Sequence, residues 1–429
     1  MTDVDVAVVG AGVAGLAAAY RLAGSGCEVR VFEAADVVGG RMTTLREDGF
    51  VIDTCAEQIA ERGYRETWKL LAELGIDRTA APRIGRGIEM WRGRARGGVA
   101  QPRGLITGAG LGVRARLDGA RAMRGTFDVE RPEVSGLGDR TVAEFAAPYH
   151  PDLLDYLLQP VVSGFFGWQP ARSAVAPLLA LLTSVGSPRT WRTYAEGMDT
   201  FARALAEKVD VTTGFRVDQV VDDGSSARIV SGAREISARA VLLAVPAPVA
   251  AGLHPCHGSA FLSVCSFTPV VKAHLLLDRP LGGPGYALTV PTAEDGTVAT
   301  IIFDHLKNPG RAPAGRGLVT LMAHPSVAPD LLTMADDDVT ERLAGAGERF
   351  VPGLRSATRR AIVRRVPDAL PEATPRALAL RAGFEASLGQ GAVDYAGDWV
   401  FLSPCSEAAV RSGLRAARRL APVVSGDSG

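Results

Sequence analysis

Lysine, cysteine and long apolar runs are scarce in this sequence of 429 residues. Four of the 47 basic residues are lysines, so arginine carries almost all of the positive charge. The five cysteines form no CxxC pair, and their odd number argues against a disulfide framework. No apolar run reaches about 18 residues, and the N-terminus has acidic residues where a signal peptide needs basic ones. We therefore expect a cytoplasmic protein without a transmembrane helix.

The formal net charge is zero, because 47 basic residues balance 47 acidic ones. A neutral total gives no reason to expect attraction to nucleic acid or to a membrane. One tract, residues 82–124, departs from this balance with ten arginines and two acidic residues. Two interpretations stay open for it. It is a solvated face, or it attracts a carboxylate-bearing substrate, an acidic partner or lipid headgroups.

One short segment brings together His254, Cys256 and His257. A metal site needs further ligands at suitable spacing, and none follows these three. We predict no metal.

The first 41 residues hold the strongest local pattern. Asp5–Val9 is an apolar run typical of a buried strand, and Leu16–Ala23 has helical spacing. A Gly-x-Gly-x-x-Gly turn joins them, and a second strand, Glu28–Phe32, ends at Glu33. Strand, glycine turn, helix, strand and acid in this order are the layout of a dinucleotide-binding unit.

Each part of this unit has a physical role. Gly10 permits the tight turn, Gly12 lets the backbone approach a pyrophosphate, and Gly15 lets helix and strand pack closely. The helix N-terminus offers N–H groups to the phosphates, and Glu33 can accept both hydroxyls of a ribose. The contacts predicted in this unit are Gly10, Gly12, Val13, Ala14, Gly15, Glu33 and Ala34.

The turn Gly39-Gly40-Arg41 follows shortly after this acid. Here the sequence resembles the FAD-dependent amine oxidase superfamily, whose members carry a Gly-Gly-Arg turn that wraps the second half of the FAD pyrophosphate. An NAD-only fold has no need of that turn. The resemblance implies FAD as the cofactor, and no sulfur-bearing motif matches covalent flavin attachment, so we expect FAD to be noncovalent.

The resemblance extends to other cofactor contacts. The family uses a Gly-Asp pair like Gly397-Asp398 for the ribityl and phosphate region, before a final helix whose N-terminus points at the pyrimidine end of the ring. Val217 matches the position whose backbone touches the adenine. Ala56 and Glu57 belong to the segment that passes beside the flavin, where Cys55 replaces a usual glycine.

The strand Val271–Leu277 carries the candidate catalytic residues Lys272 and His274, which share one face. In amine oxidase relatives the lysine of this strand holds a water against flavin N5, and Lys272 stands at the matching position. An edge strand with Lys272 in solvent is the alternative. For His274 a satisfied core position competes with a catalytic role. Glu57, the third candidate, is a base, a contact for a cationic substrate, or a structural residue.

The middle of the chain predicts a substrate region. The mostly helical stretch 141–184 contains a pattern that resembles the protoporphyrinogen oxidase branch of the superfamily. In it, Phe165, Phe166 and Trp168 line an apolar cavity or pack in the core. Monoamine oxidases place a cage aromatic before the final helix, where this chain has Cys405, so an amine-cage substrate is not implied.

A helix at 196–208 and strands at 209–221, 227–230 and 235–245 predict a return to the cofactor domain. The expected fold is α/β, with a Rossmann-like FAD-binding domain and an inserted mixed α+β substrate domain. We assign 1–75, 196–250 and 388–429 to the FAD-binding domain. The substrate domain then comprises 76–195, mainly helical, and 251–387.

The resulting function hypothesis is an FAD-dependent oxidase or desaturase, closest in pattern to the protoporphyrinogen oxidase and phytoene desaturase-like branch. It would remove two hydrogens, at C–N or C–C, from a small apolar or aromatic substrate in a biosynthetic pathway. No second dinucleotide unit is evident, which favours O2 or a quinone as the electron acceptor. A redox-neutral isomerase or cyclase and an FAD-binding pseudo-enzyme are the alternatives, and the oligomeric state stays open.

Overall fold

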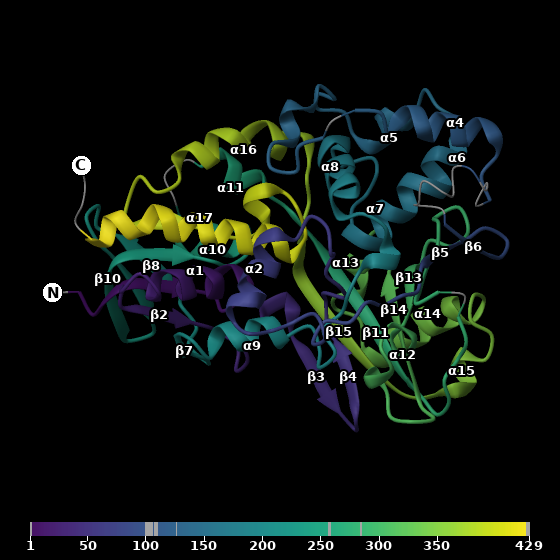
Figure 1. The fold of residues 1–429 in the computed structure, drawn as a ribbon, viewed down its shortest axis with the longest axis horizontal. Coiled ribbons are helices and arrows are strands. Elements are labelled where there is room, and N and C mark those ends of the chain that lie inside the picture. Colours follow the sequence, from purple (N-terminus) through teal and green to yellow (C-terminus); the bar gives the residue numbers. More distant parts are fainter. Residues whose placement is uncertain are drawn as a thin grey trace.

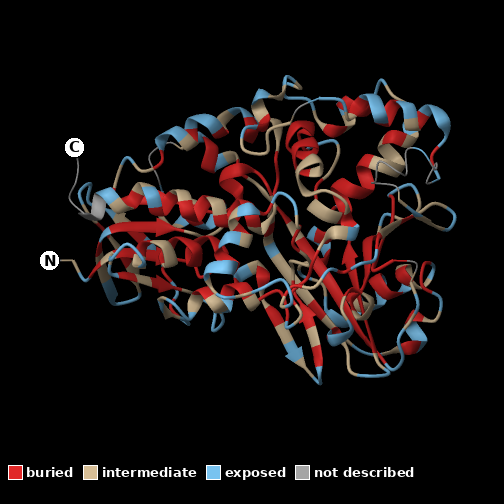
Figure 2. Cartoon of the chain, in the orientation of Figure 1, coloured by how far each residue is buried: buried red, intermediate tan, exposed pale blue. Residues whose placement is uncertain are grey.

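The computed structural model describes residues 2–98, 106, 110–125, 127–255, 259–283 and 285–425. Two sheets lie at opposite ends of the molecule, with both termini beside the first sheet and a group of helices above the second (Figure 1). Buried residues follow the strands of both sheets, whereas exposed residues follow outer helices such as α4 (Val113–Ala122) (Figure 2).

The first sheet is built mainly from parallel strands. Its order is β7-β2-β1-β10-β9-β8, and β16 pairs with β10 in addition. Its strands are β1 (Val4–Val9), β2 (Val29–Phe32), β7 (Asp210–Thr212), β8 (Gln219–Asp222), β9 (Ala227–Ser231), β10 (Arg234–Leu243) and β16 (Val393–Tyr395). The pairs β7-β2, β2-β1, β1-β10 and β10-β16 are parallel, and the pairs with β9 are antiparallel. This is the Rossmann-like part of the predicted fold, with the antiparallel strands β8 and β9 attached to β10.

Two helices pack closely beside this sheet, α1 (Val13–Ala23) and α17 (Ser406–Ser425). A Cβ added to Gly413 of α17 would lie 2.1 Å from the carbonyl oxygen of Ala14. A glycine is therefore required where the two helices cross. The contact joins the first helix of the chain to its last.

The single strand predicted over 209–221 is wrong, because the chain forms β7 and β8 with an irregular segment between them. In that segment, the N–H of Phe215 donates to the carbonyl oxygen of Glu33 at 2.8 Å. The N–H of Gly214 donates to that of Ala35 at 2.9 Å. These bonds replace strand pairing and hold the segment at the end of β2.

The second sheet is mostly antiparallel, in the order β15-β11-β14-β13-β12-β5-β6. Its strands are β5 (Ile88–Trp91), β6 (Ala95–Gly97), β11 (Phe267–Leu277), β12 (Ala287–Thr289), β13 (Val298–Phe303), β14 (Gly317–Ala323) and β15 (Thr358–Pro371). Strand β11 lies between β14 and β15, so the edge-strand alternative for Lys272 is wrong. Helices α13 (Ala328–Leu331), α14 (Asp336–Glu348) and α15 (Leu354–Ala357) cover one face of this sheet with apolar side chains.

Helices α7 (Gln159–Phe166) and α8 (Val175–Val185) belong to the group above this sheet, and α7 packs on β12 and β13. The others of the group are α4, α5 (Val142–Ala146) and α6 (Pro151–Leu153). The other described α-helices are α2 (Arg65–Glu73), α9 (Thr200–Ala206), α10 (Ala247–Leu253), α11 (Ala260–Val264), α12 (Asp304–Lys307) and α16 (Pro375–Ser387), and a separate hairpin is formed by β3 (Thr44–Glu47) and β4 (Phe50–Asp53). No helix in the described ranges is long and apolar enough to span a bilayer.

Two predictions fall partly outside the described residues, namely the arginine-rich tract and the segment with Cys256 and His257. In the described part of the tract, several arginines have acidic partners, such as Arg92 with Asp152 at 2.8 Å. Among the described residues no cluster of His, Cys, Asp or Glu is arranged to hold a metal ion.

Candidate active site

The glycine-rich loop after β1 is tight on one side and open on the other. Gly10 has φ +105°, and a Cβ there would lie 2.8 Å from the carbonyl oxygen of Ala244. A Cβ on Gly15 would lie 2.1 Å from the carbonyl oxygen of Gly10. A Cβ on Gly12, in contrast, would meet no atom within 4 Å. The loop thus offers free space at Gly12, directly before the N-terminus of α1, where a phosphate group fits.

The Gly-Gly-Arg turn lies against this loop. The N–H of Gly39 donates to the carbonyl oxygen of Ala11 at 2.9 Å, and a Cβ on Gly40 would lie 3.5 Å from Cα of Gly12. Gly39 has φ +113°, in the region that favours glycine. The two glycine turns, which are separated by α1 and β2 in the sequence, therefore form one backbone surface around the free space at Gly12.

The carboxylate of Glu33 lies at the end of β2, beside this surface. It accepts the N–H groups of Ala11 at 2.8 Å and of Ala35 at 2.9 Å. These bonds fix its orientation, and its oxygens keep acceptor capacity for ribose hydroxyls. Val217 lies two residues beyond Phe215, which is bonded to the backbone of Glu33.

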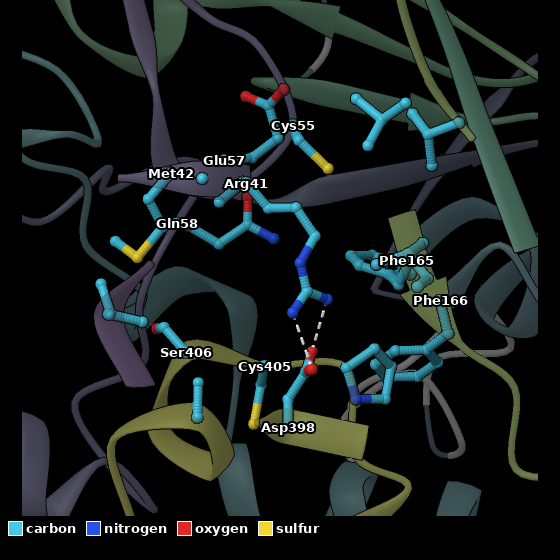
Figure 3. Close-up of a pocket in the computed structure, with 18 of the residues that line it drawn as sticks. Arg41, Met42, Cys55, Glu57, Gln58, Phe165, Phe166, Asp398, Cys405 and Ser406 are labelled. Atoms are coloured by element: carbon cyan, nitrogen blue, oxygen red, sulfur yellow. Dashed lines mark hydrogen bonds and ion pairs between the residues drawn. The ribbon is translucent and has the colours of Figure 1, made fainter. Parts of the chain in front are cut away.

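A cavity of about 530 Å³ connects this backbone surface with the second sheet (Figure 3). Its volume is in the range of cofactor and substrate sites. The sequence-predicted residues that line it are Gly10, Gly12, Val13, Ala14, Glu33, Gly39, Gly40, Arg41, Ala56, Glu57, Lys272, Gly397 and Asp398. Those that do not line it are Gly15, Ala34, Val217 and His274.

Arg41 and Asp398 meet inside the cavity (Figure 3). Both nitrogens of the Arg41 fork donate to the Asp398 carboxylate at 2.7 Å, and one also donates to the carbonyl oxygen of Ala369 at 2.8 Å. A paired guanidinium and carboxylate with this geometry is strong and directional. The pair joins the Gly-Gly-Arg turn to the C-terminal Gly-Asp segment.

The N-terminus of α17 also reaches the cavity. Cys405 and Ser406 line it just where this helix begins, and the N–H of Gly397 donates to Ser412 Oγ at 3.0 Å. A helix N-terminus favours negative charge placed before it. Burial raises the pKa of the Cys405 thiol, which therefore stays neutral.

Lys272 lies at the cavity wall, where two protein groups accept hydrogen bonds from its ammonium group. Its Nζ donates to the carbonyl oxygen of Cys55 at 2.7 Å and forms an ion pair with Glu57. The second carboxylate oxygen of Glu57 is paired with another lysine, Lys307. Burial alone would raise the pKa of Glu57, but the two ammonium groups outweigh it and lower the pKa to about 2. Glu57 is a carboxylate with both oxygens occupied, which makes it a poor base.

Sequence reasoning missed Lys307 as a site residue. It is fully buried on α12, where it pairs with Asp304 at 3.0 Å and with Asp53 at 3.2 Å. Arg311 completes the cluster with a 2.9 Å pair to Asp53. The rarity of lysine was the available signal, because two of the four lysines in the sequence meet at one glutamate.

His274 is linked to Asp304 of this cluster through the hydroxyl group of Thr320. Its Nδ1 lies 2.8 Å from Thr320 Oγ1, and that hydroxyl donates to Asp304 at 2.7 Å. Since the hydroxyl hydrogen is used for Asp304, Nδ1 of His274 must be the donor to Thr320. Burial lowers the pKa of His274 to about 3, so the ring is neutral. This geometry supports a structural role.

One part of the cavity wall is aromatic. Phe165 and Phe166 of α7 lie there (Figure 3). Trp191 also lines the cavity and meets Phe165 edge to face at 5.7 Å between ring centroids. Trp168, in contrast, is buried in the core and donates from Nε1 to the carbonyl oxygen of Pro371 at 2.9 Å. The two alternatives for these aromatic residues therefore both occur, each for different side chains.

Together, the fold and the glycine turns are those of a dinucleotide-binding protein with a cavity beside the turns. The chain matches the family described as flavin containing amine oxidoreductase over residues 13–421, and it belongs to this family of FAD-dependent enzymes. The expected superfamily, fold class and cofactor are confirmed.

The individual relatives match only short segments of the chain. The chain is 48% identical over 93 residues to a candidate flavin-containing monoamine oxidase of Mycobacterium tuberculosis, which covers 22% of this chain and 20% of that protein. It is 58% identical over 48 residues to 4,4'-diapophytoene desaturase of Staphylococcus aureus, covering 11% of this chain and 10% of that protein. These alignments thus span a fifth of the relatives' length or less.

One similar solved structure covers nearly the whole chain. A candidate protoporphyrinogen oxidase from Exiguobacterium superposes with a TM-score of 0.77 over 98% of this chain and 99% of that chain, at 17% identity. At this identity the likeness concerns the fold.

Proposed function

We propose that the protein is an FAD-dependent oxidase or desaturase that removes two hydrogens from a small apolar or aromatic substrate, at a C–N or a C–C bond, in a biosynthetic pathway. The observation that carries the proposal is one cavity whose wall includes both the glycine turns and the aromatic side chains of Phe165 and Phe166. A cofactor held at the glycine turns then meets a substrate held at the aromatic side chains.

The residues around the glycine turns fit noncovalent FAD. Gly12 and the N-terminus of α1 offer space and N–H groups for the pyrophosphate, and Glu33 offers acceptors for the ribose. The pair of Arg41 and Asp398 lies beside the N-terminus of α17, which suits the ribityl and ring region. FAD supplies the redox chemistry when bound, by accepting two electrons at its ring.

The chain's own residues give the substrate site its character. The aromatic side chains of α7 exclude water, and Lys272 presents its ammonium group at the cavity wall. We propose that Lys272 holds a water or a polar substrate atom there. Because both oxygens of Glu57 are paired with lysines, that carboxylate is not free to bind a cationic amine, which favours a neutral substrate.

The test is anaerobic addition of porphyrinogen-like, carotenoid-like and aromatic amine compounds to the purified holoprotein. Lasting bleaching of the flavin by one of them supports the oxidase or desaturase. Product formation with the flavin left oxidised would instead establish the isomerase or cyclase. Lys272→Met should keep the flavin and slow the bleaching, and re-oxidation by air or by a soluble quinone would then identify the acceptor.

A further inference from the structure

The second buried lysine is not explained by cofactor or substrate binding. Lys307 has no exposed side-chain surface, and its three partners are all carboxylates, from Glu57, Asp304 and Asp53. Burying an ammonium group costs several kcal/mol unless it is paired. The Glu57 carboxylate lies between Lys307 and Lys272, the lysine at the cavity wall.

The charges alternate along this cluster. Lys272, Lys307 and Arg311 supply three positive charges, and the three negative charges come from Glu57, Asp53 and Asp304. Glu57 stands between the two ammonium groups with one oxygen on each. The ion pair with Lys307 therefore restrains the orientation of the Glu57 carboxylate. The orientation of that carboxylate in turn restrains the position of Lys272 Nζ.

We propose that Lys307 is a positioning residue: it fixes the Glu57 carboxylate, which in turn holds Lys272 as a charged group at the cavity wall. The inference rests on the proposed role of Lys272 beside the flavin. Without Lys307, one oxygen of Glu57 would be buried and unpaired, and the carboxylate would take up a proton more easily. The titratable groups around Glu57 are Cys55, Lys272, His274, Tyr286, Asp304 and Lys307.

Arg311 provides the matched control. Like Lys307 it is completely buried and pairs with Asp53, at 2.9 Å, but the ion pairs of Glu57 are with the two lysines. Lys307→Met and Arg311→Met each remove one buried positive charge from the same cluster. Both should destabilise the fold to a similar degree, so stability does not separate positioning from packing.

The separating measurement is an infrared titration of the holoprotein that follows the carboxylic acid band lost in Glu57→Gln. In the wild type Glu57 should give no such band above about pH 4, since its pKa is about 2. In Lys307→Met the titration should move up by two or more pH units, as expected for a buried carboxylate that loses a charged partner. Lys307→Arg should restore the wild-type curve, and Arg311→Met should keep it.

A flavin readout connects this titration to the cavity. A positive charge near the ring stabilises the reduced anionic flavin, so Lys272→Met and Lys307→Met should both lower the flavin midpoint potential, and Arg311→Met should lower it less. An equal shift in Arg311→Met, or an unchanged Glu57 titration in Lys307→Met, would overturn the proposal.

If Lys307→Met does not fold, the infrared titration of the wild type still tests the arrangement. A carboxylic acid band of Glu57 between about pH 4 and 9 in the wild type would refute it. The same infrared titration can also be made on the apoprotein, without flavin. A protein that binds no FAD would therefore refute the proposed function and leave the coupling of Lys307 to Glu57 testable.

Discussion

Arg41 and Asp398 are 357 positions apart in the sequence and form a two-pronged ion pair, with both N–O distances at 2.7 Å. Asp398 is almost completely buried, whereas Arg41 retains about a quarter of its side-chain exposure, 26%. The pair ties the turn after β2 to the segment before α17. It therefore joins an N-terminal and a C-terminal segment of the chain at the cavity.

Arg41→Ala should cost about 3–5 kcal/mol of unfolding free energy, because it leaves a buried carboxylate unpaired. It should also weaken FAD binding. Urea denaturation and titration of the apoprotein with FAD measure the two effects. The control is Arg21→Ala, which removes a half-exposed pair with Glu73 and should cost about 1 kcal/mol or less. Equal stability losses in the two variants would show that the Arg41–Asp398 pair stabilises the fold no more than a half-exposed ion pair does.

Gly12→Ala and Gly15→Ala should affect different properties, FAD binding in the first case and stability in the second. Gly12 has φ −72° and free space where a Cβ would stand, so alanine should change the stability of the apoprotein by about 0.5 kcal/mol or less. The same methyl group would occupy the phosphate space and should weaken FAD binding about tenfold or more. Gly15→Ala would clash with the backbone of Gly10 and should cost about 1–3 kcal/mol or more. Calorimetry of FAD binding and thermal unfolding test both, and tight FAD binding by Gly12→Ala would contradict the assignment.

His274 predicts a pH dependence of stability. The pKa is about 6.5 in the unfolded chain and about 3 in the folded protein, so only the unfolded chain takes up a proton as the pH falls between these values. The folded state is therefore stabilised above about pH 6.5 and loses this advantage below it, by about 2 kcal/mol on going from pH 7 to pH 5. His274→Asn should lose about that much less over the same interval. Urea unfolding at both pH values measures it, and identical pH dependence in the two proteins would refute the neutral, buried ring.

The aromatic residues of the helical region should separate by role. Trp168→Ala should cost about 3–5 kcal/mol of stability, because Trp168 fills the core and donates to Pro371. Phe165→Ala should cost less and should change the relative rates with substrates of different size. Thermal unfolding and anaerobic reduction rates with the substrates found in the screen distinguish the two. A loss of stability in Phe165→Ala as large as that in Trp168→Ala would place Phe165 in the core.

The cofactor part of the cavity could be predicted because its signals are local. The glycines of the first turn, Glu33 and the Gly-Gly-Arg turn lie within 41 residues, and each has a backbone reason to be where it is. The predicted strands and helices there deviate from the structure by a few residues at their ends. The assignments of individual site residues and the domain boundaries stay predictions.

The cluster around Lys272 and Lys307 could not be predicted to the same extent, because its groups meet through long-range pairing. Glu57 and Lys307 are 250 residues apart, and β11 becomes a central strand only when β14 and β15 pair with it. Strand alternation alone left Lys272 open to solvent or cavity. The irregular segment between β7 and β8 was missed for the same reason, since its backbone partners lie at the end of β2.

The central claim is that this chain holds FAD noncovalently at the part of the cavity wall formed by the glycine turns. The most direct test is the visible spectrum of the purified protein before and after acid precipitation. We expect flavin absorption that passes into the supernatant when the protein precipitates and is identified there as FAD. A colourless protein that also takes up no added FAD would contradict the account.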